Sequence, residues 1–361
     1  MPPRSGRAAG LTAAIDSPIH RHVTIAQDIE DTVIPASPGG RGRLPHIGVL
    51  RFSGPDAVGF LQGQVSNDTL PLSRGAPVLA AYSTPQGRVL AILHLLPHSS
   101  GILALLPRDV AASTQDRLRK FVLRAKVQIE DVSERIGVFG MDGNALAAAG
   151  VGDAPGATGY VEKDGIGIGR VRDSAAASAR YWVVGDAASI VGGASDGGAS
   201  TGGASSSGIS SSGVSSNGVS SDEAARIERN WRLGDIREGL PQVYAATSES
   251  FVAQMLNLDL IGGISFSKGC YTGQEIIART QHLGRIKRRL SRLRLPAGAW
   301  SIGQPLRLAD GRTGRLTEIV PVGGGFEALA VLSLDAGAAD LDTASGEAIP
   351  AEELPLPYRT S

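Results

Sequence analysis

The residues with the clearest chemical potential stand in one short run, Lys268 to Glu275, which reads KGCYTGQE and holds the only cysteine of the chain. Thr272 and Glu275 stand three positions apart just before an apolar pair, the spacing of a capping box, so a helix is expected to begin here. Cys270 would then lie just outside a helix N-terminus, and Lys268 would bring an ammonium group close to it. Because both features stabilise a thiolate, the sequence predicts a lowered pKa for the Cys270 thiol.

Two interpretations of this cysteine are open. A lone cysteine in a reducing compartment is commonly a buried structural residue. The neighbours of Cys270 are instead Lys, Gly, Thr and Gln, which favours a thiol that faces a ligand or reacts. Gly269 and Gly273 are expected to let the backbone turn tightly and approach a ligand. Lys268 is a candidate only because it lies in this motif, since most lysines are solvated surface charges.

The composition restricts the classes of function. The chain has 361 residues and a formal net charge of zero, with 35 Lys+Arg and 35 Asp+Glu, so no overall field attracts nucleic acid or an anionic membrane. One cysteine excludes an intramolecular disulfide, and no set of side chains has metal-ligand spacing. There is no secretory signal and no apolar run long enough to span a membrane. We therefore expect a cytoplasmic protein without a metal site.

Positive charge is concentrated just after the cysteine motif. Six cations fall within ten residues: Arg285, Lys287, Arg288, Arg289, Arg292 and Arg294. They indicate either a local anion site, for a carboxylate-rich small molecule or an acidic partner, or simply a solvated strand face. Aromatic residues are not interleaved with them, so stacking on nucleic-acid bases is not indicated.

The length requires more than one ordinary core, and two or three domains are expected. Residues 1–40 are expected to be a weakly ordered lead-in. Mixed strands and helices without a steady βαβ rhythm predict an α+β fold for 41–191 and 222–289. Between them, 192–221 consists of five-residue Gly/Ser-rich units and is interpreted as a flexible insert. The strand-rich segment 290–361 is predicted to form a small, separate β-barrel.

Local patterns predict the individual elements around the motif. Val78 to Thr84 and Val89 to Leu96 are typical of a strand pair joined by a tight turn at Pro85-Gln86-Gly87. A helix is expected from Asp222, and Glu249 to Leu260 is a second helical candidate. Ile261 to Phe266 is predicted to be a glycine-containing strand that leads into the motif.

The run KGCYTGQEIIAR is similar to the signature of the YgfZ family, the folate-binding relatives of the glycine-cleavage T-protein, an aminomethyltransferase. The resemblance covers 47–334 apart from the Gly/Ser-rich insert. It is carried further by elements along the chain: Gly54-Pro55-Asp56-Ala57, Phe60 to Gln64, Ser66-Asn67-Asp68, Pro85 to Arg88, Ala225 to Glu228 and Leu240-Pro241-Gln242.

The resemblance implies a three-domain fold with tetrahydrofolate bound in a central funnel. It also implies a role in assembling or repairing iron–sulfur clusters in client enzymes, including one that modifies tRNA. Lys268 and Cys270 would be the functional pair. Cofactor contacts are implied at Glu228, Asn67, Tyr271 and Gln274. For Glu228, which matches a position that hydrogen-bonds the pterin in T-proteins, a solvated helix glutamate is the alternative.

One departure from the T-protein pattern bears on the reaction. T-proteins carry a GGIxDD stretch whose acidic residue serves aminomethyl transfer, and here Ala91 and Ile92 stand where acids would be. An apolar pair cannot orient an amine, so the sequence favours a folate-binding accessory protein. A folate-dependent aminomethyltransferase is the alternative. Asn230 replaces the glycine of the family's ARIEAG helix. Direct action on tRNA is disfavoured because no basic patch with aromatic residues is present.

Overall fold

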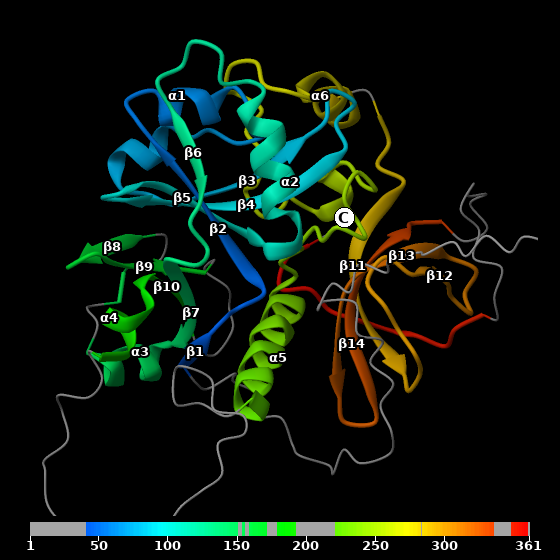
Figure 1. The fold of residues 1–361 in the computed structure, drawn as a ribbon. Helices are drawn as coiled ribbons and strands as arrows, with labels where there is room; N and C mark the ends of the chain where they lie inside the picture. Colours follow the sequence, from blue (N-terminus) through cyan, green and yellow to red (C-terminus); the bar gives the residue numbers. More distant parts are fainter. Residues whose placement is uncertain are drawn as a thin grey trace, which may run out of the picture.

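The computed structural model describes residues 41–150, 154–155, 159–171, 179–192, 221–282, 284–335 and 348–359. The expected lead-in at 1–40 and almost all of the Gly/Ser-rich insert lie outside these ranges. Within them the chain forms three five-stranded antiparallel sheets, with helices packed on and between them (Figure 1). The mixed helix-and-sheet fold class is thus confirmed. No helix in the described part of the chain combines the length and apolar character needed to cross a membrane.

The first sheet carries the side of the molecule on which the cysteine motif lies. Its strand order is β3-β4-β5-β2-β6, with β2 at Ile47–Ser53, β3 at Val78–Ser83, β4 at Val89–His98, β5 at Gly101–Pro107 and β6 at Gln128–Asp131. Two α-helices and a 3₁₀ helix accompany it: α1 at Ala57–Gln62, η1 at Leu70–Arg74 and α2 at Arg108–Arg119. The predicted strand pair is confirmed as β3 and β4, in antiparallel register with an irregularity at Tyr82/Ser83.

The second sheet has the order β1-β7-β10-β9-β8. Its strands are β1 at Arg41–Arg43, β7 at Ile136–Asp142, β8 at Tyr160–Lys163, β9 at Ile166–Arg170 and β10 at Arg180–Asp186. Two short helices cover it: α3 at Gly143–Ala149 and α4 at Ala187–Gly192. The Asp142 side chain caps α3 by accepting from the Ala145 amide at 2.7 Å, the usual role of an Asp at this position.

The third sheet, predicted to be a closed barrel, is open in the described residues. Its order is β12-β13-β14-β11-β15, with β11 at Arg288–Pro296, β12 at Pro305–Arg307, β13 at Thr313–Val322, β14 at Gly325–Ser333 and β15 at Glu352–Leu354. Closure requires the two edge strands to pair. Both edge strands, β12 and β15, are only three residues long and do not pair with each other, although an isolated parallel bridge joins Leu308, next to β12, to Ile349, which precedes β15. The predicted barrel is therefore not confirmed.

The long helix α5, Ser221–Glu238, confirms the helix expected from Asp222 and lies between the second and third sheets (Figure 1). Buried ion pairs attach it to both. Arg180 of β10 pairs with Asp235 at 2.9 Å and with Glu238 at 2.7 Å. On the opposite side, Arg232 pairs with Glu318 of β13 and Arg237 with Glu327 of β14.

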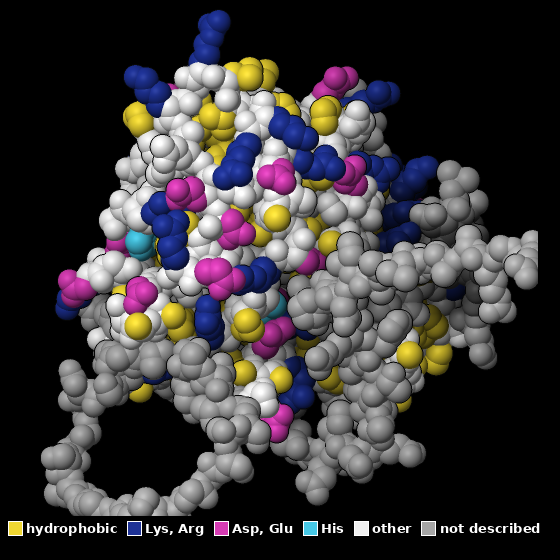
Figure 2. All heavy atoms as spheres, in the orientation of Figure 1, with side chains coloured by type: hydrophobic (Ala, Val, Ile, Leu, Met, Phe, Trp, Pro, Cys, Tyr) yellow, Lys and Arg dark blue, Asp and Glu magenta, His cyan; other side chains and the backbone are white. Residues whose placement is uncertain are grey.

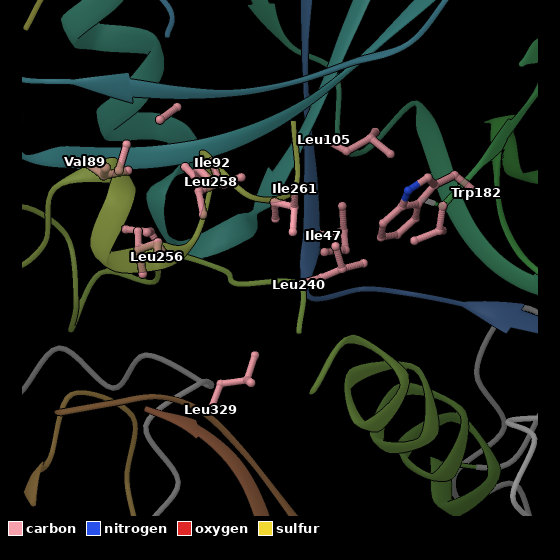
Figure 3. Packing of buried hydrophobic residues seen from close by; sticks show 14 of the residues in the cluster. Ile47, Val89, Ile92, Leu105, Trp182, Leu240, Leu256, Leu258, Ile261 and Leu329 are labelled. Carbon is pink, nitrogen blue, oxygen red and sulfur yellow. The ribbon is translucent and has the colours of Figure 1, made fainter. Parts of the chain in front are cut away.

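One hydrophobic core is shared by all three sheets. Figure 3 shows Ile47, Ile92 and Leu105 of the first sheet, Trp182 of the second and Leu329 of the third around the same interior. The space between them is filled from connecting segments, by Leu240, Leu256, Leu258 and Ile261. The sheets thus contact one another through this core, and each also has a hydrophobic cluster of its own.

Two elements predicted before the motif were wrong. Glu249 to Leu260 forms only a 3₁₀ turn, η2 at Ala253–Leu256, because Asn257 adopts a left-handed conformation (φ +57°) that ends it. Ile261 to Phe266 is not a strand in the structure. Its amides instead form hydrogen bonds outside any sheet. Gly263 N donates to Leu258 O within a turn, and Ser265 N donates to Ser66 O in the segment after α1. The helix after the motif, α6, runs from Gln274 to His282.

Candidate functional site

Lys268 is held by three backbone carbonyl groups. Its Nζ donates to Gln62 O at 2.6 Å, to Val65 O at 2.9 Å and to Asn67 O at 2.8 Å. An ammonium group has three donors, so each is used. Lys268 therefore joins the motif to the C-terminal end of α1 and to the loop that follows it.

The charge of Lys268 also lies over an aromatic ring. Its Nζ is 4.9 Å from the centroid of the Tyr271 ring, a cation–π contact. Burial lowers the pKa of Lys268 to about 8, opposed by the charge of Asp68. Burial likewise raises the pKa of Tyr271 to about 12. At neutral pH the pair is therefore an ammonium group above a neutral phenol.

Asn67 and Ser66 complete the connection between these segments. The side-chain amide of Asn67 donates to Leu79 O at 2.8 Å and to Gly262 O at 2.7 Å. Its Oδ1 accepts from the Asp68 amide at 2.9 Å, so all of its hydrogen bonds here are internal. Ser66 Oγ donates to Gly263 O at 2.6 Å. The structure thus brings Asn67 and Lys268 together. The cofactor contact that the family resemblance implies for Asn67 stays a prediction.

The helix after the motif begins with a reciprocal pair shifted by one residue from the predicted capping box. The Gln274 amide donates to Tyr271 O at 3.2 Å, and Gln274 Oε1 accepts from the Tyr271 amide at 3.3 Å. The box expected between Thr272 and Glu275 is not formed. Gln274 thus fixes the motif at the N-terminal end of α6, and Tyr271 is oriented by the same contact.

Gly273 and Gly87 allow the motif to press against the turn between β3 and β4. Gly273 has φ +84°, and a Cβ added there would lie 2.6 Å from Thr84 O. Gly87, in the turn itself, has φ +71° and lies against Ile276 of α6. Two of the segments that resemble the YgfZ family therefore touch each other. Gly269, by contrast, has no neighbour within 4 Å of an added Cβ and no positive φ.

Alanine substitution should affect the confined glycine, Gly273, and the unconfined one, Gly269, to different extents. Gly273→Ala is expected to lower the free energy of unfolding by about 1–3 kcal/mol, from strain at positive φ together with overpacking against Thr84 O. Gly269→Ala should change it by less than about 0.5 kcal/mol, as at an ordinary exposed position. Urea unfolding of both variants measures the difference. Equal losses would mean that the motif backbone is not held by the turn.

Cys270 is an exposed free thiol. No hydrogen bond or ion pair joins it to Lys268 in the described residues, because the ammonium group is directed at the three carbonyl groups of the α1 end. The two members of the predicted functional pair are therefore neighbours in the chain with different surroundings. Lys268 is fixed and half-buried, while the thiol faces outward.

Glu228 belongs to a different part of the molecule. It lies on α5, with its Oε1 3.6 Å from His46 Nδ1. Burial opposes its ionisation, but the proximity of His46 and the charge of Arg232 outweigh burial and lower the pKa of the Glu228 carboxyl. No described contact joins Glu228 to Lys268 or Cys270. The four implied cofactor residues are thus divided, with Asn67, Tyr271 and Gln274 around the motif and Glu228 apart.

His46 is a residue that the sequence gave no reason to select. Its side chain is 9% exposed, and its Nδ1 has no hydrogen-bond partner although it is buried. The Glu228 carboxylate, 3.6 Å from this nitrogen, is its polar neighbour at a distance too long for a hydrogen bond. His46 and Glu228 stand far apart in the chain, so only the tertiary fold could bring them together.

Three of the six cations in the basic cluster after the motif pair with acidic side chains of the protein. Arg289 forms a bidentate pair with Asp259 at 2.7 and 2.9 Å. Arg292 pairs with Glu327 at 2.6 Å, and Arg285 lies 3.8 Å from Asp335. These three pairs reduce the charge that the cluster offers to an anion. Among the described residues, no three His, Cys, Asp or Glu side chains gather as metal ligands.

Comparison with known proteins identifies relatives of this arrangement. No protein-family model matches the chain. Over 250 residues it is 30% identical to the tRNA-modifying protein YgfZ of Colwellia psychrerythraea, which covers 68% of this chain and 69% of that protein. Its fold is similar to that of the glycine cleavage system aminomethyltransferase T from Bartonella henselae, with a TM-score of 0.54, 12% identity, and coverage of 83% of this chain and 80% of that one. At that identity the structural likeness concerns the fold alone.

Proposed function

Because the chain belongs to the YgfZ family, as its curated relative shows, we propose that it is a tetrahydrofolate-binding accessory protein that assists assembly or repair of iron–sulfur clusters in client enzymes. Enzymes that modify tRNA are among the proposed clients, in keeping with the name of that relative. The observation that carries the proposal is the motif itself. The motif presents one exposed thiol, Cys270, two residues after a lysine whose ammonium group is fixed by backbone carbonyl groups.

The surroundings of Cys270 suit transfer to a partner better than a reaction of the protein's own. A nucleophilic cysteine needs a base or a charge that holds its thiolate. The nearest cation in the chain, Lys268, is committed to backbone carbonyls. An outward-facing thiol on a stiff loop can instead reach a sulfur or iron atom of another protein.

Glu228 and His46 are the residues that fit a folate. A pterin has an edge of amide and amine donors, and one carboxylate can accept two hydrogen bonds from such an edge. The lowered pKa of Glu228 keeps its carboxylate ionised at neutral pH, and His46 Nδ1, 3.6 Å from it, adds a polar atom beside it. Tetrahydrofolate, when bound, would supply the reduced pterin. Glu228 and His46 would bind and orient its edge.

Aminomethyl transfer remains the alternative because of the similar fold, but the residues at the relevant strand argue against it. Ala91 and Ile92 lie in β4 and are completely buried, Ile92 in the core shared by the three sheets and Ala91 in that of the first sheet. Neither can hold or deprotonate an amine. Release of a one-carbon unit from an aminomethyl donor to tetrahydrofolate by the purified protein would favour the transferase over the accessory role.

A tetrahydrofolate titration tests the binding residue. Glu228→Ala is expected to weaken binding by about tenfold to a hundredfold, the loss for hydrogen bonds to a charged group. Glu223→Ala is the matched control, because Glu223 is an exposed glutamate on the same helix, paired with Arg226. Isothermal calorimetry under anaerobic conditions gives both affinities. Equal binding by the wild type and Glu228→Ala would refute the assignment of Glu228.

A further inference from the structure

The segment 119–126, which consists of the last residue of α2 and the loop that leads toward β6, exposes apolar side chains. Leu123 is 86% exposed and Phe121 is 47% exposed. Single exposed hydrophobic residues are normal on protein surfaces, but here two lie within three positions of one another. Leu123 is the most exposed of the large hydrophobic residues that the structure describes.

The same loop carries only positive charge. Arg119, Lys120, Arg124 and Lys126 are all exposed, and no acidic residue occurs from Arg117 to Ile129. Arg119 donates to Ile129 O at 3.0 Å. Within the described chain, the side chains of Lys120, Arg124 and Lys126 form no ion pair or hydrogen bond. Figure 2 shows Lys/Arg and hydrophobic side chains beside one another at the top of the molecule, where Figure 1 places this loop.

The loop is held in one conformation. Val122 and Ala125 pack inward on the core of the first sheet, which leaves Phe121 and Leu123 outward. The Lys126 amide donates to Asp56 Oδ2 at 2.7 Å, just before α1 begins. An apolar patch presented in a fixed conformation loses little entropy on binding.

The position of the loop connects it to the motif. Asp56 precedes α1, and Gln62 at the other end of α1 accepts from Lys268. A six-residue helix is about 9 Å long, at 1.5 Å per residue. The loop and the motif that exposes Cys270 are therefore attached to opposite ends of the same short helix.

We propose that residues 119–126 are a docking site for an acidic protein partner. Phe121 and Leu123 would enter an apolar pocket of the partner, and carboxylates around that pocket would pair with Lys120, Arg124 and Lys126. An apolar centre with a charged rim is the usual anatomy of such interfaces. The proposal does not depend on folate binding. Where the proposed function holds, the partner docked here is the client whose cluster Cys270 serves.

A protein fits this surface better than a membrane or a nucleic acid. Asp56 and Asp116 are exposed beside the loop, and a uniformly anionic lipid surface or phosphate backbone would be repelled by both. A protein partner can leave them at its rim. Stacking of nucleic-acid bases needs a series of aromatic rings, and the loop has only Phe121.

Photochemical crosslinking in cells tests the proposal with the full chain. Leu123 is replaced by p-benzoylphenylalanine, and after irradiation the adducts are sequenced by mass spectrometry. The expected product is a protein adduct whose crosslinked peptide is rich in Asp and Glu. Lys120→Glu combined with Arg124→Glu should lower its yield by about tenfold, because the rim pairs become repulsive.

Val161 provides the matched control. It is an exposed apolar residue of β8 with an exposed lysine, Lys163, two positions away, and it lies on the second sheet. Photoreactive substitution there should give no such adduct, and Lys163→Glu should leave the Leu123 adduct unchanged. Melting temperatures of all variants should equal that of the wild type. An adduct with lipid or RNA, a yield no higher than at Val161, or an adduct indifferent to the charge reversal would overturn the proposal.

Discussion

Replacing Arg180 by methionine should lower the free energy of unfolding by about 3–5 kcal/mol, the loss observed when one partner of a buried ion pair is removed. Arg180 is 2% exposed, and the side chains of its partners Asp235 and Glu238 are 4% and 6% exposed. The substitution leaves two carboxylates buried without a cation. It also removes the guanidinium group that lies 4.6 Å from the ring centroid of Trp231.

The loss should become smaller as the pH falls. Burial raises the pKa of Asp235 to about 6 even with Arg180 present, and without that arginine the carboxyl is more easily protonated still. A protonated carboxyl needs no counter-charge, so the variant recovers stability relative to the wild type as the pH falls toward about 6, and below it Asp235 is protonated in both proteins. Urea unfolding at several pH values measures this dependence.

Arg226→Met is the control for this prediction. Arg226 pairs with Glu223 one helical turn away, but both side chains are more than 40% exposed. Exposed pairs of this kind contribute about 0.3–0.5 kcal/mol. A loss for Arg180→Met no larger than that for Arg226→Met would show that the buried triad does not hold α5 to the second sheet.

Substitutions at Cys270 and Lys268 should reduce the proposed function in two different ways. Cys270→Ala is expected to reduce the activity of a cluster-dependent tRNA-modifying enzyme in cells to that of a strain lacking the protein, with an unchanged melting temperature. The thiol is exposed and has no described side-chain contact, so the fold does not need it. Lys268→Met should reduce both the activity and the free energy of unfolding, the latter by about 1.5–3 kcal/mol for lost charged hydrogen bonds.

Ser267→Ala is the matched control, since Ser267 is an exposed residue of the same loop. It should leave cluster-dependent activity and melting temperature as they are. Anaerobic modification assays of tRNA from complemented cells, together with thermal melts of the purified variants, provide both measurements. Full activity of Cys270→Ala would contradict the role proposed for the thiol.

The sequence predicted well those features that depend on neighbours in the chain. The alternation around Pro85-Gln86-Gly87 identified the β3–β4 pair, and the apolar spacing after Asp222 identified α5. Sequence periodicity reports which face of an element is buried, and that information is local. The motif was located in the same way, although its helix begins with Gln274 rather than with a Thr272–Glu275 box.

The rest depended on contacts that no local pattern encodes. The ammonium group of Lys268 donates its hydrogen bonds to backbone carbonyl groups near α1. Every residue has a backbone carbonyl group, so the sequence does not indicate which ones accept. Glu228 acquires its partner, His46, only through the packing of α5 beside the second sheet, because His46 lies in the turn that follows β1. The helix predicted for Glu249 to Leu260 is not formed because Asn257 takes a left-handed conformation. In that conformation its side-chain amide donates a hydrogen bond to Leu290 O, which is distant in the chain.

The ion pairs of α5 determine how this molecule can lose or exchange its parts. Asp235 and Glu238 need a cation from the second sheet, while Glu318 and Glu327 of the third sheet need Arg232 and Arg237. Each sheet therefore binds α5 through charges on a different side of the helix, and unfolding should occur in a single cooperative transition. A descendant that shed the third sheet would leave Arg232 and Arg237 in solvent and would uncover the part of the shared core that Leu329 and Val331 now cover.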